Sequence, residues 1–157
     1  MCEPMPPIYN VQLNSLVDAV NLALLYSKKE KYHQKLNSYL IKTAKTKEEI
    51  TILASIRKDL DKHQKFMQNF YTYFAGKEIP KENILFIASE DYLENLKAAF
   101  LDNEENIKLF TQMYSLVIQS LYNESYTNVI FEILQDAQRH SGLYNFILNL
   151  NIMNKLN

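Results

Sequence analysis

The sequence predicts an all-α protein, an antiparallel four-helix bundle made of two helical hairpins joined by a long crossover. Gly occurs only twice and Pro only four times in 157 residues, and a sheet protein would need more residues of this kind for its tight turns. Apolar residues recur at alternating steps of three and four along four long segments, which indicates amphipathic helices. A chain of this length forms one domain with a single core.

The first hairpin is expected to consist of helices over 11–40 and 47–75, joined by a short link near 42–46. The first helix carries a stripe of Leu13, Leu16, Val20, Ala23 and Ser27. The stripe of the second helix is Leu53, Ile56, Leu60, His63, Met67 and Phe70. Gly76 is a typical residue after a helix end, and Pro80 prevents continuation. These two residues therefore end the first hairpin.

The second hairpin is expected over 89–120 and 125–150, with a short link near 121–124. Ser89 is a good N-cap and is followed by acidic residues. The third stripe is Leu93, Leu96, Phe100, Asn103, Ile107, Phe110, Tyr114 and Val117. The fourth is Ile130, Ile133, Ala137, His140, Tyr144 and Ile147. The longer segment 76–88 connects the hairpins, and this connectivity is that of bundles with one long crossover.

The two hairpins contain a matched pair of elements. An Asp precedes a His by four residues in "KDLDKH" (58–63) and again in "QDAQRH" (135–140), so that Asp59 and His63 lie 77 residues before Asp136 and His140. The chain holds three histidines in all, and two of them fall in this repeat. The sequence therefore indicates one hairpin repeated once.

Four stretches carry a resemblance to a known family: "SLVDAVNLALLYS" (15–27), "ASIRKDLDKHQKF" (54–66), "AAFLDNEENIKLF" (98–110) and "EILQDAQRHSGLYNF" (132–146). They resemble the ferritin-like, rubrerythrin-type di-iron carboxylate superfamily, over residues 10–150. The resemblance implies a bundle in which each hairpin supplies one Glu from its first helix and Glu-x-x-His from its second. Together these ligands hold two iron or manganese ions for oxidase or peroxidase chemistry.

The glutamates of that pattern are missing, although both histidines match. The positions where the family has Glu are occupied by Ala23, Leu60, Asn103 and Ala137. His63 and His140 alone cannot hold two hard, oxygen-preferring ions. We therefore expect a degenerate site with no bound cofactor, no catalytic residues and no oxidase or peroxidase activity.

The aspartates suggest a different use for the two histidines. In relatives, the Asp before each inward Glu can accept a hydrogen bond from the metal-bound His of the other hairpin. The resemblance thus implies a metal-free polar link in which Asp59 faces His140 and Asp136 faces His63. One alternative is a weak mononuclear site for Zn, Fe or Mn built from the same four residues. In a second alternative, the aspartates are simply solvated.

Three classes of function follow from this interpretation. The first is a non-catalytic scaffold or interaction module, acting as a homo-oligomer such as a dimer or with another protein. The second is a vestigial protein that binds one metal ion. The third is a binder of a small ligand in a cavity left at Ala23 and Ala137, unless Leu60, Phe100 or Tyr144 fills it.

Composition narrows the partners and the location. The formal charge of −1 gives no overall attraction to nucleic acid. No stretch approaches the roughly 18–20 apolar residues of a membrane span, and the N-terminus does not resemble a signal peptide. We expect a cytoplasmic protein with a flexible segment over 1–9, the bundle over 10–150 and a tail over 151–157.

Two local patterns are interpreted as incidental. "EKYH" at 30–33 is a literal Glu-x-x-His, but it has no counterpart in the other hairpin. Glu30 is expected to touch the stripe and His33 to lie off it, which makes the match a chance one. The basic run "KKEKYHQK" at 28–35 is expected to be a solvated face.

Overall fold

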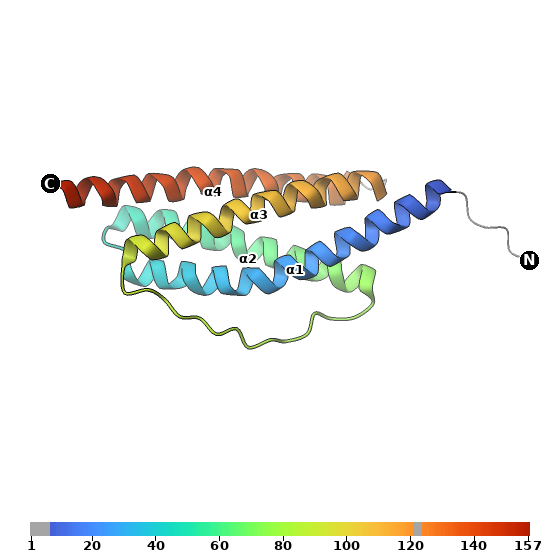
Figure 1. Ribbon diagram of the computed structural model, residues 1–157, viewed down its shortest axis with the longest axis horizontal. Helices are drawn as coiled ribbons and strands as arrows, with labels where there is room; N and C mark the ends of the chain where they lie inside the picture. The colour runs from blue at the N-terminus through green and yellow to red at the C-terminus, as the bar shows by residue number, and fades with distance from the viewer. Residues whose placement is uncertain (1–6, 121–123) are drawn as a thin grey trace, which may run out of the picture.

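The computed structural model describes the backbone of residues 7–120 and 124–157, and the side chains from residue 14 onward within those ranges. These residues form four helices: α1 (Pro7–Thr43), α2 (Lys47–Ala75), α3 (Tyr92–Ser120) and α4 (Glu124–Leu156). The helices α1 and α2 form one hairpin, α3 and α4 form the other, and an extended crossover joins them (Figure 1). The predicted all-α four-helix bundle of two hairpins is therefore confirmed.

Several helix ends differ from the expected ones. Helix α1 begins at Pro7 instead of residue 11, and Pro suits a first helical turn because it has no N–H to leave unpaired. Helix α4 continues to Leu156, through residues expected to form a tail. The expected flexibility of residues 1–6 and the link at 121–123 lie outside the described residues.

Helix α3 begins at Tyr92, because Asp91 and not Ser89 serves as its cap. The Asp91 carboxylate accepts a hydrogen bond from the backbone N–H of Leu93 at 2.8 Å. The Ser89 hydroxyl accepts from the N–H of Asp91 at 3.1 Å, so it supports the cap from outside the helix. The sequence placed both residues at the start of this helix. Asp91 is the N-cap because its side-chain oxygen reaches a free amide of the first turn.

Gly76 ends α2 in a left-handed conformation, with φ at +68°, and its N–H donates to the carbonyl of Thr72 at 3.0 Å. An added Cβ would meet no atom within 4 Å there. Gly76→Ala should therefore lower the free energy of unfolding by about 1 kcal/mol through backbone strain alone.

Urea denaturation of the full chain measures this effect, and Gly142→Ala is the matched control. Gly142 lies inside α4 without a positive φ, and its Cβ would also meet no atom within 4 Å. The control should gain roughly 0.5–1 kcal/mol from helix propensity. Two shifts of the same sign would contradict the assignment of Gly76 as a strained helix end.

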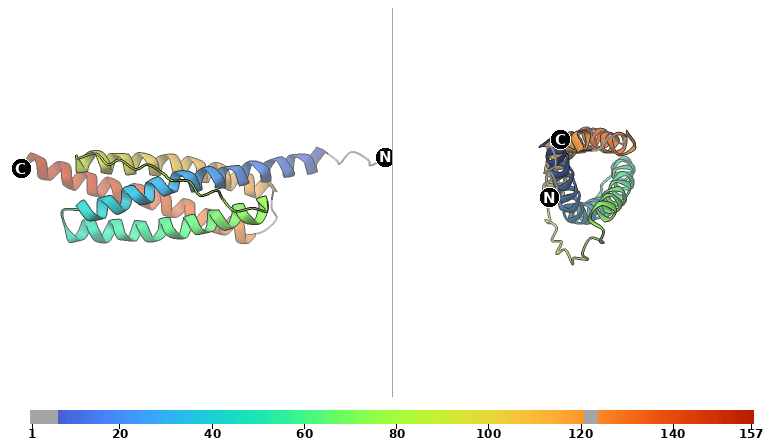
Figure 2. Two further views of the ribbon diagram at one scale, coloured as in Figure 1. Left: turned by 90° about the horizontal axis from the view of Figure 1, so that it is seen from below. Right: turned by 90° about the vertical axis from the view of Figure 1, so that its right-hand side faces the viewer.

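The four helices do not contact one another equally. Helix α1 packs against both α2 and α3, and α3 packs against α4, whereas α2 and α4 share much less close backbone contact. The end-on view in Figure 2 shows the four helices around a common axis. Among the helix pairs that are in contact, α2 and α4 therefore have the least close backbone packing.

The crossover, residues 76–91, runs along the outside of the first hairpin (Figure 1). Its side chains alternate, with Ile84 and Phe86 partly buried and Leu85 and Ile87 exposed by 80% and 73%. The ring of Phe86 lies 5.5 Å from that of Tyr32 on α1. This alternation is typical of an extended segment with one side on the protein.

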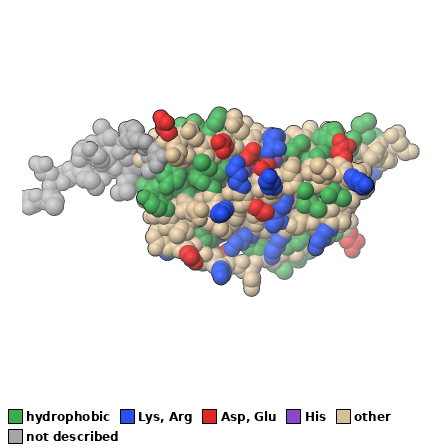
Figure 3. Space-filling view, turned by 180° about the vertical axis from the view of Figure 1, so that it is seen from behind, with side chains coloured by type: hydrophobic (Ala, Val, Ile, Leu, Met, Phe, Trp, Pro, Cys, Tyr) green, Lys and Arg blue, Asp and Glu red, His purple; other side chains and the backbone are tan. Residues whose placement is uncertain are grey.

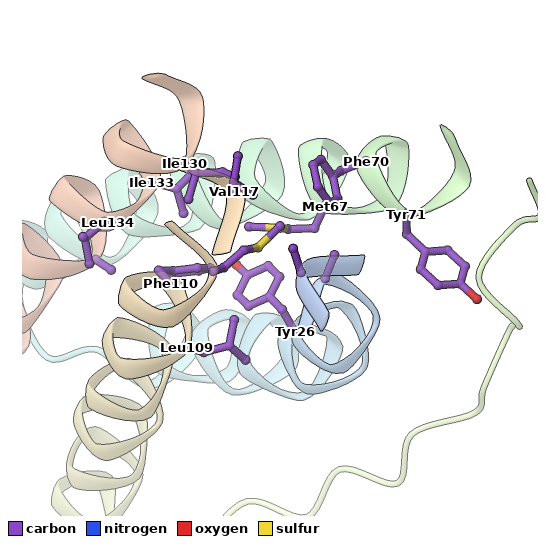
Figure 4. Close-up of a cluster of buried hydrophobic side chains, with 14 residues drawn as sticks. Tyr26, Met67, Phe70, Tyr71, Leu109, Phe110, Val117, Ile130, Ile133 and Leu134 are labelled. Carbon is purple, nitrogen blue, oxygen red and sulfur yellow. The ribbon is translucent and has the colours of Figure 1, made fainter. Parts of the chain in front are cut away.

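The core consists of two apolar clusters separated by polar residues. Figure 4 shows the first cluster, which includes Tyr26, Met67, Phe70, Phe110, Val117 and Ile133. The second cluster includes Leu36, Leu53, Ile56, Leu60, Leu96 and Tyr144. On each helix, buried polar residues lie between the two: Ser27, Glu30, His33, His63, Gln64, Asn103, Asn106 and His140. We call this set the central polar layer. No helix in the described part of the chain is both long and apolar enough to cross a membrane.

Candidate functional site

His63 and His140 are the centre of the polar layer. Each is only 1% exposed, and their rings stack with centroids 6.1 Å apart. They come from α2 and α4, which share the least close backbone contact among the neighbouring helix pairs. Figure 3, which views the molecule from the side opposite to Figure 1, accordingly shows no histidine on that face. Polar groups buried this deeply require partners, because a buried imidazole without one is costly.

Each histidine is paired with an aspartate of the other hairpin. His63 Nε2 lies 2.9 Å from Asp136 Oδ2, and His140 Nε2 lies 3.0 Å from Asp59 Oδ2. These are the two pairs that the resemblance implies. The aspartate side chains are 20% and 22% exposed, so they lie at the boundary of the bundle and not in open solvent. The two bonds cross between α2 and α4 in opposite directions.

Arg139 joins the two aspartates, and the sequence analysis did not identify it. Its Nη2 lies 2.6 Å from Asp59 Oδ2 and 3.3 Å from Asp136 Oδ1. Arg139 is next to His140 in the sequence. It follows Asp136 by three positions, a spacing at which side chains on a helix come into contact. We call Asp59, His63, Asp136, Arg139 and His140 the Asp–His–Arg cluster. All five connect α2 with α4.

The protonation of this cluster follows from burial and its hydrogen bonds. Burial lowers the pKa of His63 and His140, although the paired carboxylates act in the opposite direction. Burial also disfavours the charged form of Asp59, but the bonds from His140 and Arg139 outweigh this and lower its pKa. The neutral imidazole of His140 therefore donates from Nε2–H to the ionised carboxylate of Asp59, since an ionised carboxylate only accepts.

The positions of the missing glutamates are all buried. Ala23, Leu60, Asn103 and Ala137 are each at most 2% exposed. Asn103 Nδ2 donates at 2.8 Å to both the carbonyl of Ala137 and the hydroxyl of Ser141. Ser141 in turn donates to the carboxylate of Glu104. Asn103 therefore links α3 to α4 through neutral hydrogen bonds.

The side chains present do not fit a di-metal centre. Within residues 14–120 and 124–157, no three His, Cys, Asp or Glu side chains come close enough to hold a metal ion. The carboxylates of Asp59 and Asp136 are already bound to imidazole and guanidinium groups. Because Arg139 is cationic, it also disfavours a metal cation at the same oxygens.

The space near the two alanines is packed with core side chains. Ala23 and Ala137 both belong to the first apolar cluster. In that cluster the rings of Tyr26 and Phe110 lie 4.8 Å apart. Neither Ala23 nor Ala137 lines any of four surface pockets formed by described residues.

The expectation that His33 lies off the buried stripe is wrong. His33 is 1% exposed, and its Nε2 lies 3.0 Å from the hydroxyl of Tyr144 on α4. Glu30, one turn earlier, is completely buried. Because α1 packs against both α2 and α3, it buries a wider face than a single stripe. Continuing the three-four steps beyond Ser27 would have reached both residues.

Several polar atoms of this layer have no hydrogen-bond partner among the described protein groups. They are both carboxylate oxygens of Glu30, the Nδ1 atoms of His33 and His140, the Oγ of Ser27 and the Oε1 of Gln64. Burial raises the pKa of Glu30 well above its ordinary value of 4.5, and the nearby Tyr26 and Arg57 offset this only in part. Burial lowers the pKa of His33 to about 3. The interior therefore favours the neutral form of both groups.

This arrangement is suited to holding two hairpins together. Its imidazoles are neutral, its boundary carboxylates are paired, and Glu30 is shielded from water. The chain matches no protein-family model, no curated protein and no solved structure at a significant level. The geometry of the central polar layer is therefore the basis for a proposal about function.

Proposed function

We propose that this chain is a degenerate ferritin-like bundle, related to the rubrerythrin type, that works as a cytoplasmic scaffold or interaction module without redox catalysis. The observation that carries this proposal is the Asp–His–Arg cluster. In di-metal bundles, carboxylates of this kind orient histidines that hold metal. Here the same type of bond links α2 to α4 directly, while neutral side chains occupy the four positions where the resemblance expects Glu.

Electrostatics supports a role that does not depend on metal. Four glutamates in a bundle interior repel one another unless two divalent cations neutralise them. With Ala23, Leu60, Asn103 and Ala137 at those positions, the repulsion is absent and no cation is needed. In the cluster, each aspartate instead pairs with Arg139 and with an imidazole.

Elemental analysis tests this proposal. Purified protein, incubated with ferrous, manganese or zinc salts and then desalted, should retain much less than one ion per chain. Its melting temperature should not rise with added metal, because only a ligand of the folded state stabilises it. Two retained ions per chain would refute the proposal.

A gain-of-function variant tests whether the four positions correspond to the metal ligands of a ferritin-like bundle. The quadruple variant A23E/L60E/N103E/A137E restores Glu at all four positions. It should be less stable than the parent without metal and should regain stability when ferrous or manganese salt is added. Leu53→Glu, which buries a single carboxylate in the second apolar cluster, is the control. Metal should not rescue it, and equal behaviour of both variants would contradict the ferritin-like assignment.

One metal ion of Zn, Fe or Mn is the second candidate. It is favoured by the buried carboxylate of Glu30 and the buried Nδ1 of His140, which have no partner among the described groups. Such ions accept both ligand types. Side chains would have to move, because no three ligands are close together in the part of the chain described. One retained ion per chain, lost in His140→Leu, would favour this candidate.

An interaction module also needs a surface for a partner. Exposed apolar side chains are Leu85 and Ile87 on the crossover, and Met153 and Leu156 near the end of α4. We propose a homodimer or another protein as the partner. Light scattering over a concentration series tests the homodimer directly.

A further inference from the structure

The crossover covers part of the first hairpin and forms a groove of about 590 Å³ with it. Its walls come from α1, α2 and crossover residues 82–86. Four cationic side chains line it, together with two aromatic rings: Lys31, Lys35, Lys42, Arg57, Tyr39 and Phe86. We call it the basic groove. Its volume lies within the range of roughly 300–1,000 Å³ that is usual for small-ligand pockets.

Three of the four cationic side chains of the basic groove have no ion-pair partner among the described residues. Glu82 is its one acidic lining residue, and this carboxylate pairs with Lys28 at 2.9 Å. Lys31, Lys35 and Lys42 form no ion pair within the described residues, whereas Arg57 pairs with Asp61 at 2.8 Å. Lys35 donates to the carbonyl of Ile84 at 2.7 Å, a bond that neutralises no charge. Because the whole chain has a formal charge of −1, this excess is local.

The arrangement of these lysines is unfavourable for the isolated helix. Lys31 and Lys35 are four residues apart on α1, and Lys42 follows seven residues later on the same face. Like charges at this spacing destabilise a helix by a few tenths of a kcal/mol per pair. Part of the basic run 28–35 lines this groove, through Lys31 and the exposed Lys35.

Aromatic rings form the other part of the wall. Phe86 meets Tyr39 edge to face, with ring centroids 6.1 Å apart, and meets Tyr32 at 5.5 Å. On the opposite wall Arg57 Nη1 donates to the carbonyl of Gln34 at 2.7 Å and to the hydroxyl of Ser38. The guanidinium of Arg57 is therefore held by hydrogen bonds to α1.

We propose that the basic groove binds a nucleoside phosphate, with the lysines on the phosphate groups and the base against Tyr39 and Phe86. Lysine ammonium groups bind phosphate as compact point charges, and aromatic side chains stack on the flat faces of bases. This site is separate from the central polar layer, so it does not depend on the proposed function.

Calorimetric titration of the full chain with ADP and GDP tests the site, with ribose 5-phosphate as the probe that lacks a base. We expect measurable binding of at least one nucleotide at low salt, with several-fold weaker binding when the ionic strength rises. Ribose 5-phosphate should bind at least several-fold more weakly. Equal affinity for the probe without a base, or no binding of either nucleotide at millimolar concentration, would overturn the proposal.

The double variant K31Q/K42Q removes two cations while leaving the bond from Lys35 to the crossover intact. We expect this variant to bind the nucleotide at least about tenfold more weakly than the parent. A tenfold change in Kd corresponds to the energy of little more than one contact between a lysine and a phosphate group. The matched control K97Q/K108Q removes two exposed lysines of α3, which pair with Glu94 and Glu105 away from the groove. Circular dichroism checks that both variants fold. Equal loss in both double variants would show general charge attraction and overturn the site.

Discussion

Replacing Glu30 with Gln is expected to stabilise the protein at neutral and alkaline pH, by an amount that grows with pH. The carboxylate is fully buried without a well-formed hydrogen bond, and burial raises its pKa well above 4.5. Above pH 4.5 the unfolded chain releases this proton while the folded chain keeps it. Wild-type stability therefore falls as pH rises from there to the pKa of the folded state. The amide of Gln does not titrate, so the variant lacks this loss.

The size of the effect follows from proton linkage. Each pH unit between the two pKa values changes the free energy of unfolding by about 1.4 kcal/mol. Urea denaturation of wild type and Glu30→Gln, at intervals from about pH 4 to about pH 9, gives the difference directly. Glu132→Gln is the control, because that side chain on α4 is 60% exposed. A difference for Glu30→Gln that does not increase with pH would contradict the assignment of Glu30 as a buried acid.

The same experiment separates the buried histidines from Glu30. Burial lowers the pKa of His33 to about 3 from an ordinary value of 6.5. Below pH 6.5 the unfolded chain binds a proton that folded His33 does not, so this stability is lost as the pH falls toward 3. Between pH 4.5 and 6.5 the two groups act in opposite directions. Burial lowers the pKa of His63 and His140 as well, so these two histidines act in the same direction as His33. Wild-type stability should therefore fall with decreasing pH there, and the stability of Glu30→Gln should fall more steeply because it lacks the opposing change at Glu30.

The fold could be predicted because it depends on spacing along single helices. Apolar residues at every third or fourth position predict both a helix and which of its faces is buried. Gly76 predicts where α2 ends. The start of α3 was less well defined, since Ser89, Glu90 and Asp91 all suit a helix start and only the reach of the Asp91 carboxylate decides. Spacing determines a helix more firmly than it determines the helix ends.

The candidate site was predictable only where a pattern described both partners. The histidines lie on the stripes, but the pairing of Asp59 with His140 came from the resemblance, since spacing on α2 does not indicate which residue of α4 lies opposite. Arg139 was missed because a half-exposed Arg looks like an ordinary surface residue. His33 was missed because the width of the buried face of α1 depends on its packing against two helices. The basic groove depends on the path of the crossover, which the apolar spacing does not describe.

A double-mutant cycle on Asp59 and His140 is expected to show strong coupling. Asp59→Ala leaves the Nε2–H of buried His140 without its partner, and such a loss costs about 1–3 kcal/mol of stability. His140→Leu removes the imidazole that needs the bond. The double variant should therefore lose less stability than the sum of the two single variants, with a coupling energy of about 1–2 kcal/mol.

The exposed pair of Lys62 and Glu132 provides the matched cycle, because it also joins α2 to α4 but at 3.9 Å and with both side chains more than half exposed. Its coupling energy should be near zero, as for most surface ion pairs. A large coupling energy for Asp59 and His140, with a small one for Lys62 and Glu132, would show that the buried hydrogen bonds stabilise the contact between the hairpins. Charge attraction alone would not explain that difference. Additive losses at Asp59 and His140 would mean that apolar packing closes this boundary without them. That outcome would contradict the proposal that Asp59 and His140 form a stabilising, metal-free link between the hairpins.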